Sequence, residues 1–247
     1  MHASTLLLGA AALLVENVSA HGFVKTVNIK GVSTKGSDPV WFYQGNNRVA
    51  TAGWDSLNQD LGFVEPNRAS SADVNCHKSA TPGKLYANAN PGDTIEFEWN
   101  TWPDSHRGPI IHYIAPCNGE CSSMSPSDLR WSKFAQEAIV SPNVWVTDNL
   151  IKNGFKASVK LPSKLAAGNY VVRHEIIALH GGSSPNGAQL YPQCINIKVG
   201  GSGTVRPTNG VPGTSLYTPT TPGILFNIYT NPTSYPFPGP ALWTAAN

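Results

Sequence analysis

The chain has 247 residues, a formal net charge of +2 and 13% charged residues, where soluble proteins usually have about 25%. Its 23 glycines and 20 prolines favour a loop-rich β protein over one built from long charged helices. Lysine and arginine do not cluster as they do in proteins that neutralise phosphates, which argues against a nucleic-acid partner. The length fits a single large β domain.

An apolar run from Leu6 to Val15 lies near the start of the chain and is followed by a small-x-small triplet that ends at Ala20. Signal peptidase cuts after such a triplet, and the run is too short to cross a bilayer. We therefore predict a signal peptide over residues 1–20, a secreted, extracellular protein without membrane association, and His21 as the first residue after cleavage. The alternative, a buried N-terminal helix, does not explain the triplet, because no helix stop signal accompanies it.

Six later segments have the period-two alternation or β-rich composition of strands, and each is bounded by Gly, Pro or Asn. They are Gly22 to Ile29, Thr94 to Trp99, Ile110 to Ala115, Phe155 to Leu161, Tyr170 to Leu179 and Cys194 to Val199. Only Ser127 to Val140 has helical spacing, with Ser127 as a possible N-cap. Its apolar residues are Leu129, Trp131, Phe134 and Ala138. The pattern predicts an all-β fold, an antiparallel β-sandwich of the immunoglobulin or fibronectin III type with long loops and a short helical insertion.

Four cysteines in an exported chain are expected to form bridges, and three pairings are possible. Cys117 and Cys121 are close enough to close a small local loop, which leaves Cys76 to pair with Cys194. The chain-entropy model credits such a long-range bridge with about 4–5 kcal/mol. A zinc site is less favoured, because no CxxC pair occurs.

The C-terminal part of the chain changes composition after residue 199. Residues 200–223 resemble a linker, but we predict no separate binding module beyond them. Residues 224–247 are too short for an independent core and are rich in aromatic residues. We therefore predict one domain over residues 21–247, with residues 200–247 packed on it as a tail.

Two histidines are candidate metal ligands. Removal of residues 1–20 would give His21 a free α-amine, and this amine and the ring of the same residue can chelate one metal ion. A histidine at a cleavage site is a weak signal by itself, since it also fits an ordinary residue of the first strand. His106 stands on a turn before the strand predicted from Ile110, where a rigid loop can present its ring. It fits an ordinary surface histidine equally well.

A third candidate ligand lies near the end of the domain. Gln189 and Tyr191 share one strand face by period two, and Pro192 and the bridged Cys194 would fix the backbone there. Tyr191 is therefore a candidate axial ligand.

The predicted strand from Tyr170 to Leu179 presents different groups on its two faces. His180 follows it and is a candidate hydrogen-bonding residue beside the metal, whereas His174 on the same face better fits a core histidine. Glu175 lies on the opposite face with Arg173, where the two are expected to form a structural ion pair.

In combination these segments resemble the fungal cellulose-active lytic polysaccharide monooxygenases, auxiliary activity family nine. The similarity covers nearly all of the chain after Ala20 and depends on the order and spacing of several motifs. The motifs are HGFV at His21, SHRGP around His106, YVVRHEIIALH ending at His180, AQLYPQC around Tyr191, and PGPALW ending at Trp243.

The resemblance implies a role for each candidate residue. The amine and ring nitrogen of His21 and the ring of His106 would bind one copper ion, with Tyr191 as the axial oxygen. Imidazole and amine ligands suit copper. His180 and Gln189 would be the catalytic hydrogen-bonding residues, and the resemblance implies the same two disulfides.

The resemblance also implies an activity: a monomer that cleaves cellulose or a related β-glucan oxidatively at C1, C4 or both, using O2 or H2O2. The electron donor would be a small reductant or a redox enzyme such as cellobiose dehydrogenase. A flat polysaccharide face calls for exposed aromatic rings, and we expect Tyr43 and Tyr229 to supply them, with Tyr235 as a further candidate. Each of these tyrosines also fits an ordinary packing role. Three tryptophans are assigned to structure: Trp41, Trp54 and Trp243.

Two other functions fit parts of the pattern. A glycoside hydrolase needs two carboxylates about 5–10 Å apart, and Glu175, Asp104 and Glu98 are possible members, though none forms a persuasive pair. A noncatalytic copper-binding or cell-wall-binding protein could use the same metal ligands without any chemistry. Oxidised chain ends, simple reducing ends, or no product would distinguish the three.

Overall fold

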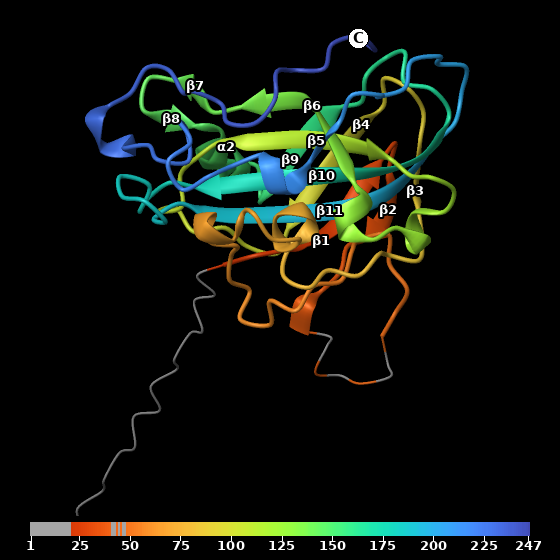
Figure 1. The fold of residues 1–247 in the computed structure, drawn as a ribbon, viewed down its shortest axis with the longest axis horizontal. Helices are drawn as coiled ribbons and strands as arrows, with labels where there is room; N and C mark the ends of the chain where they lie inside the picture. The colour runs from red at the N-terminus through yellow and green to blue at the C-terminus, as the bar shows by residue number, and fades with distance from the viewer. Residues whose placement is uncertain (1–20, 41–42, 44, 46–47) are drawn as a thin grey trace, which may run out of the picture.

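The computed structural model describes residues 21–40, 43, 45 and 48–247 (Figure 1). The predicted signal peptide and Trp41 lie outside the described residues. None of the helices in the described part of the chain is long and apolar enough to cross a membrane.

Two sheets form the body of the protein. The smaller sheet has four antiparallel strands in the order β2-β1-β4-β9, namely β2 (Val32–Lys35), β1 (Val24–Ile29), β4 (Thr94–Trp99) and β9 (Lys156–Lys160). The larger sheet has the order β12-β6-β5-β10-β11-β3, namely β12 (Val211–Pro212), β6 (Arg130–Glu137), β5 (Ile110–Pro116), β10 (Gly168–Ala178), β11 (Gln189–Val199) and β3 (Ala87–Ala89). Its pairs are antiparallel except β11 with β3, which is parallel. This architecture confirms the predicted β-sandwich.

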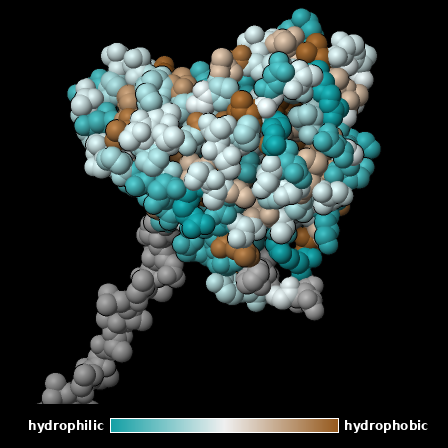
Figure 2. All heavy atoms as spheres, in the orientation of Figure 1, coloured by the Kyte–Doolittle hydropathy of each residue, from teal (hydrophilic) through white to brown (hydrophobic). Residues whose placement is uncertain are grey.

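Smaller elements cover the sheets and their ends. A separate hairpin joins β7 (Ile139–Ser141) to β8 (Val144–Trp145), and the α-helices are α1 (Asp73–Cys76) and α2 (Val146–Lys152). Single 3-10 turns are η2 (Pro66–Arg68), η3 (Cys121–Ser123), η4 (Pro126–Asp128), η5 (Gly213–Ser215) and η6 (Ile228–Thr230). Figure 2 shows a surface on which hydrophilic and neutral residues predominate and hydrophobic residues are scattered.

The larger sheet is buried on both faces, which explains its nearly continuous apolar strands. On β10, Val172 and Ile176 belong to the core cluster that contains Phe97 of the facing sheet. Val171 and Ile177 point the other way, into a second cluster formed with loops and the C-terminal tail. Alternate residues of a strand point to opposite faces, so a strand covered on both sides needs apolar residues at every position.

All six predicted strands are present as β1, β4, β5, β9, β10 and β11. The predicted helix over Ser127 to Val140 is wrong, because η4 and then β6 occupy that segment. The reason lies in Trp131 and Phe134, whose spacing of three resembles one turn of helix. In β6 that odd spacing sends the two rings to opposite faces of the larger sheet, and each face has its own core cluster.

Both predicted disulfides are present, Cys76 with Cys194 and Cys117 with Cys121, each with a Cα–Cα distance of 5.2 Å. The longer bridge joins α1 to β11. Residues 200–223 resemble a linker in sequence but take part in the fold, since β12 pairs with β6. The aromatic residues that follow pack onto the body of the protein, with the ring centroids of Tyr235 and Trp145 5.7 Å apart.

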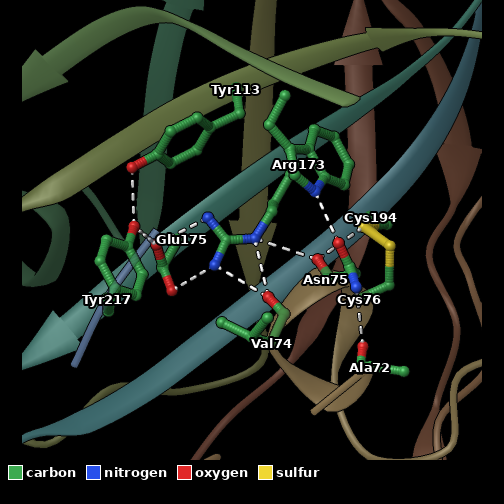
Figure 3. Close-up of polar contacts among 10 residues, drawn as sticks. Ala72, Val74, Asn75, Cys76, Tyr113, Arg173, Glu175, Cys194 and Tyr217 are labelled. Carbon is green, nitrogen blue, oxygen red and sulfur yellow. Dashed lines mark hydrogen bonds and ion pairs between the residues drawn. A yellow bond between two sulfur atoms is a disulfide. The ribbon is translucent and has the colours of Figure 1, made fainter. Parts of the chain in front are cut away.

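A fully buried ion pair anchors this outer layer (Figure 3). Arg173 and Glu175 of β10 are both 0% exposed, and their charged groups lie 2.6 Å apart. Arg173 also donates to the carbonyl oxygens of Val74 and Asn75 in α1. The hydroxyl of Tyr217, from the linker-like segment, donates to Glu175. The network ties helix, sheet and tail together, so the expected ion pair of Arg173 with Glu175 is confirmed.

Candidate metal centre

The N-terminal segment is held against the loop that follows β4. The amide of Phe23 donates to Asn100 Oδ1 at 2.8 Å. Gly22 packs so closely on this loop that an added Cβ would overlap the carbonyl oxygen of Thr101. Only glycine allows this approach, and it fixes the direction in which His21 leaves the strand.

The loop that carries His106 is fixed by similar close contacts. The indole Nε1 of Trp102 donates to the carbonyl oxygen of His106 at 3.0 Å, and the amide of Gly108 donates to Thr147 Oγ1 at 3.1 Å. An added Cβ on Gly108 would overlap the carbonyl oxygen of Ile177 in β10. The loop therefore lies directly on β10, and His106 is only 7% exposed.

Tyr191 and Gln189 lie on one face of β11, as the sequence predicts. The hydroxyl of Tyr191 donates to Gln189 Oε1 at 2.7 Å. Tyr191 is 0% exposed, because the rings around it cover it. Three residues further along β11, the disulfide of Cys194 ties the strand to α1.

Four of these side chains meet although they come from distant segments. The ring centroids of His21 and His106 are 5.5 Å apart, and Tyr191 lies 6.0 Å from His21 and 6.4 Å from His106. The ring of His180, just after β10, lies 4.1 Å from that of His106. The structure thus brings together all three predicted ligands and one of the two predicted hydrogen-bonding residues, while Gln189 joins through its bond to Tyr191.

The surroundings favour neutral imidazoles. Burial lowers the pKa of His106 to about 4, and His180 and His21 act in the same direction. Burial also lowers the pKa of His21, opposed by Asp60, and it lowers the pKa of His180. The phenol of Tyr191 stays protonated, because burial raises its pKa well above the usual value. Neutral imidazole is the form that binds metal ions.

Two ring nitrogens here are buried and lack partners. Neither Nε2 of His106 nor Nδ1 of His180 makes a hydrogen bond of normal geometry with any described residue. Nδ1 of His106 lies 3.1 Å from Ser105 Oγ, and the tautomer that donates to this oxygen leaves a lone pair on Nε2. A buried nitrogen without a partner is costly, so a metal ion at His106 fits the donor set.

Side chains alone do not complete a metal site. Across residues 21–40, 43, 45 and 48–247, no three His, Cys, Asp or Glu side chains lie together so that they could hold a metal ion. The cluster offers two imidazoles and one phenol, and a third nitrogen has to come from the backbone. In the full chain the nitrogen of His21 belongs to a peptide bond with Ala20, and cleavage would turn it into an amine.

The predicted aromatic contacts divide into exposed and buried rings. Tyr43 is 73% exposed and Tyr229 is 68% exposed. The hydroxyl of Tyr229 donates to the carbonyl oxygen of His180 at 3.1 Å, so this ring stands beside the cluster. Tyr235 is 8% exposed and donates to the carbonyl oxygen of Gly223, so its prediction as a substrate contact is wrong. It packs the tail onto the hairpin, which agrees with the prediction that residues 200–247 form a tail packed on the domain.

Residues that the sequence did not single out complete the surroundings. The ring of Trp102 lies 5.0 Å from Tyr191 and 5.9 Å from His106, both in edge contacts. Phe63 lies 6.1 Å from both His21 and Tyr191. Trp102 stands only four residues before His106, so the sequence motif could have pointed to it. Phe63 lies in a loop with no motif.

The candidate hydrolase carboxylates do not meet around a substrate site. Glu175 is fully buried in its ion pair with Arg173. Glu98 belongs to the other sheet and is bound by Lys25 at 3.0 Å. Asp104 lies in the exposed loop before His106. No pair among the three serves as an acid and a nucleophile.

The sequence matches the model of Auxiliary Activity family 9 (formerly GH61) over residues 21–236. The chain is 47% identical over 242 residues to a protein of Malbranchea cinnamomea named AA9 family lytic polysaccharide monooxygenase F, covering 96% of this chain and 98% of that protein. A protein of the same name from Emericella nidulans is 48% identical over 243 residues, with 96% and 95% covered. Among solved structures, Cel61B from Hypocrea jecorina, a glycoside hydrolase family 61 member, superposes with a TM-score of 0.86 at 46% identity, covering 90% of this chain and all of that one.

Proposed function

The chain belongs to auxiliary activity family 9, a family of lytic polysaccharide monooxygenases, and we propose that it is a secreted copper enzyme that cleaves cellulose or a related β-glucan. The proposal includes removal of residues 1–20 by signal peptidase. Its support is the apolar run with its small-x-small triplet, and the family match, which begins at His21.

Copper would be held by the α-amine and ring of His21, by Nε2 of His106 and by the hydroxyl oxygen of Tyr191. The observation that carries this assignment is the convergence of three rings within 6.4 Å of one another, beside the buried Nε2 of His106, which has no hydrogen-bond partner among the described residues. When bound, copper would supply the redox chemistry that activates O2 or H2O2 after reduction by an external donor.

The neighbouring residues would position and protect rather than exchange protons with a sugar. Gln189 Oε1 accepts a hydrogen bond from the hydroxyl of Tyr191 and so helps to fix the position of the phenol. His180 presents a buried ring nitrogen beside His106, which suits it to hydrogen-bond an oxygen ligand or substrate there. The edge of Trp102 covers Tyr191 and keeps water from that side of the cluster.

The substrate would lie over the exposed rings at this end of the sandwich. Tyr229 stands beside the cluster, and next to it lies a hollow of about 460 Å³ lined in part by Asp104, Arg107 and Asn143. An exposed ring with polar groups around it is suited to a sugar chain. We assign Tyr43 and Tyr229 to polysaccharide binding, and oxidation to C1, C4 or both. The electron donor would be a small reductant or a redox enzyme such as cellobiose dehydrogenase.

We also propose that residues 21–247 act as one catalytic domain and as a monomer. The tail supports this reading, because the backbone amide of Trp243 donates to the carbonyl oxygen of Lys133 in β6 and Tyr217 reaches the buried Glu175. These contacts make the tail part of the same folded unit.

The decisive experiment uses the secreted protein with His21 confirmed as its first residue by intact mass. Copper-loaded protein is incubated with amorphous cellulose and ascorbate, and soluble products are identified by mass spectrometry. We expect lactones, aldonic acids or gem-diols. A matched control carries one additional alanine before His21, which turns the α-amine of His21 into a peptide nitrogen while leaving every side chain in place.

The control should bind copper far more weakly and yield no oxidised products. Simple reducing ends from both proteins would instead indicate a hydrolase. Tight copper binding without any product would indicate a binding protein.

A further inference from the structure

A cavity separate from the candidate metal centre lies on the flank of the sandwich. Its volume is about 350 Å³, within the range of pockets that hold small organic ligands. It is lined by residues of β4 and β9 from the smaller sheet, β5 and β6 from the larger sheet, and α2. None of the five residues of the candidate metal centre is among them. Whatever this cavity holds would therefore not compete with the metal.

The inner wall of the cavity faces the space between the two sheets. On β5, Ile110 belongs to the core cluster between the sheets and Ile111 to the cluster on the outer face. Alternate residues of a strand share a face, so His112 points inward with Ile110. The other apolar members of this wall are Ala135, Val146, Leu150, Ala157 and Val159. The inner wall is thus aliphatic apart from one imidazole.

A chain of buried rings sets the protonation of that imidazole. The indole Nε1 of Trp99 donates to His174 Nε2 at 3.0 Å, and His174 Nδ1 lies 2.8 Å from His112 Nε2. An indole nitrogen can only donate, so neutral His174 must carry its proton on Nδ1 and donate it to His112. Burial lowers the pKa of His174 well below 6.5 and that of His112 to about 3, so both rings are neutral. His112 then carries its own proton on Nδ1.

This proton has no acceptor in the described part of the chain. His112 is 5% exposed and lines the cavity, and no described residue accepts a hydrogen bond from its Nδ1. Gln136 of β6 cannot serve, because it pairs with Ile111 and turns its side chain to the opposite face of the sheet. The remaining inner side chains are aliphatic and accept nothing. The inner end of the cavity therefore offers one hydrogen-bond donor and no side-chain acceptor.

The other polar side chains lie toward solvent. Glu137 and Asn153 are exposed, and Asn149 is half-buried. Lys156 is paired with Glu96 at 3.4 Å, so Glu137 is the lining charge without an ion-pair partner among the described residues, and it disfavours an anion. The lining contains no Trp, Tyr or Phe of the described chain on which the face of a sugar could stack. These features favour a neutral, largely apolar ligand.

We propose that this cavity is a binding site for a small neutral carbonyl compound. Its oxygen would accept a hydrogen bond from His112 Nδ1, and the aliphatic wall would enclose its hydrocarbon part. A carbonyl oxygen only accepts, so it leaves no hydrogen-bonding group unpaired at the inner end. An alcohol or a phenol brings a hydroxyl proton for which the inner side chains hold no acceptor. A water molecule would find one side-chain partner there, where buried waters usually have about two to four.

The test compares two ligands of nearly the same shape. Cyclohexanone and cyclohexanol are each titrated into the secreted protein without reductant, and calorimetry gives their affinities. We expect cyclohexanone to bind at least about 5-fold more tightly, because the hydroxyl proton of the alcohol stays unpaired. The infrared carbonyl band of bound cyclohexanone should lie at lower frequency than in a hydrocarbon solvent, as a hydrogen bond from His112 requires. Glucose, which tests the saccharide alternative, should not displace cyclohexanone.

A variant identifies the site. Ala157→Leu adds a larger side chain to the inner wall and should abolish saturable binding of cyclohexanone. Ala245→Leu makes the same change at an exposed position of the tail and should leave the affinity unchanged. If Ala157→Leu does not fold, the two ligands and the carbonyl band still decide. No binding of cyclohexanone, equal or tighter binding of cyclohexanol, an unshifted carbonyl band, displacement by glucose, or unchanged affinity in folded Ala157→Leu would each overturn the proposal.

Discussion

The imidazole rings of His106 and His180 lie with their centroids 4.1 Å apart at an interplanar angle of 36°. Each ring has a buried nitrogen that makes no normal hydrogen bond with a described residue. If His106 binds copper, as proposed, the buried Nδ1 of His180 would remain available for a hydrogen bond beside that ion.

We therefore expect His180→Asn to lower the rate of cellulose oxidation by about 10-fold to 100-fold while changing copper affinity much less. Product release measured at saturating ascorbate gives the rate, and calorimetry gives the affinity. His77→Asn is the matched control, since His77 is a buried histidine outside the cluster. An unchanged rate in His180→Asn would remove this residue from the catalytic group.

Gly22 controls the position of the N-terminal residue. Gly22→Ala places a methyl group against the carbonyl oxygen of Thr101, so the segment must move and take His21 with it. We expect weaker copper binding by calorimetry, with little change in melting temperature, because the displaced segment precedes β1. Gly200→Ala is a suitable control, because its Cβ meets chiefly the side-chain amide of Asn90, which can rotate. Equal copper affinity in both variants would contradict the role of Gly22.

The strands were predictable from sequence because their alternation is local information. β4 begins and ends where the pattern predicts, and β10 is displaced by only one or two residues. The helix predicted around Trp131 was wrong, because helical spacing of apolar residues implies an element buried on one face only. The larger sheet is instead buried on both faces, because loops and the tail form a second core on its outer face. No local sequence pattern predicts that outer layer.

The site was predictable only where short motifs carry it. His21, His106 and Tyr191 stand in motifs, and the fold brings their rings together. Phe63 comes from a long loop without periodicity, and its position depends on how that loop lies over β11, where Val64 pairs with Leu190. Contacts of this kind follow from tertiary packing and leave no sequence pattern.

The two disulfides should differ in their effect on stability. Cys76 and Cys194 are separated by 118 positions, and Cys117 and Cys121 by four. In the chain-entropy model the longer loop contributes about 3 kcal/mol more to the free energy of unfolding. We expect the Cys76→Ala, Cys194→Ala double variant to lower the urea midpoint well below that of the Cys117→Ala, Cys121→Ala variant. Equal losses would mean that native contacts, and not loop closure, set the effect.

Buried neutral histidines should make the protein sensitive to mild acid. Burial lowers the pKa of His77 and of His112 to about 3, from about 6.5 in the unfolded chain. Between these values the unfolded state binds more protons, so stability is full above pH 6.5 and falls as the pH is lowered toward 3. Each histidine contributes a slope of up to about 1.4 kcal/mol per pH unit.

Urea unfolding between pH 6.5 and 5 measures this slope before most carboxylates titrate. His77→Asn should reduce the slope by the share of one histidine, and asparagine tolerates the positive φ of 81° at this position. A slope equal to that of the unsubstituted protein would show that His77 is not the source.

The buried Arg173–Glu175 pair allows stability and chemistry to be separated. Glu175→Gln leaves the guanidinium of Arg173 buried without its counter-charge, and breaking such a pair costs about 3–5 kcal/mol. The same substitution at Glu98, whose partner Lys25 is 46% exposed, should cost less than about 1 kcal/mol. Urea unfolding of both variants measures the difference.

Both glutamates are also candidate acids of a hydrolase, so an assay of the same two variants on cellulose gives a second, independent result. Oxidised products per folded molecule should match the unsubstituted protein in both variants, because neither carboxylate belongs to the His21 cluster. If either variant folds fully but no longer cleaves cellulose, that glutamate takes part in the reaction, and this result would contradict the proposed copper chemistry.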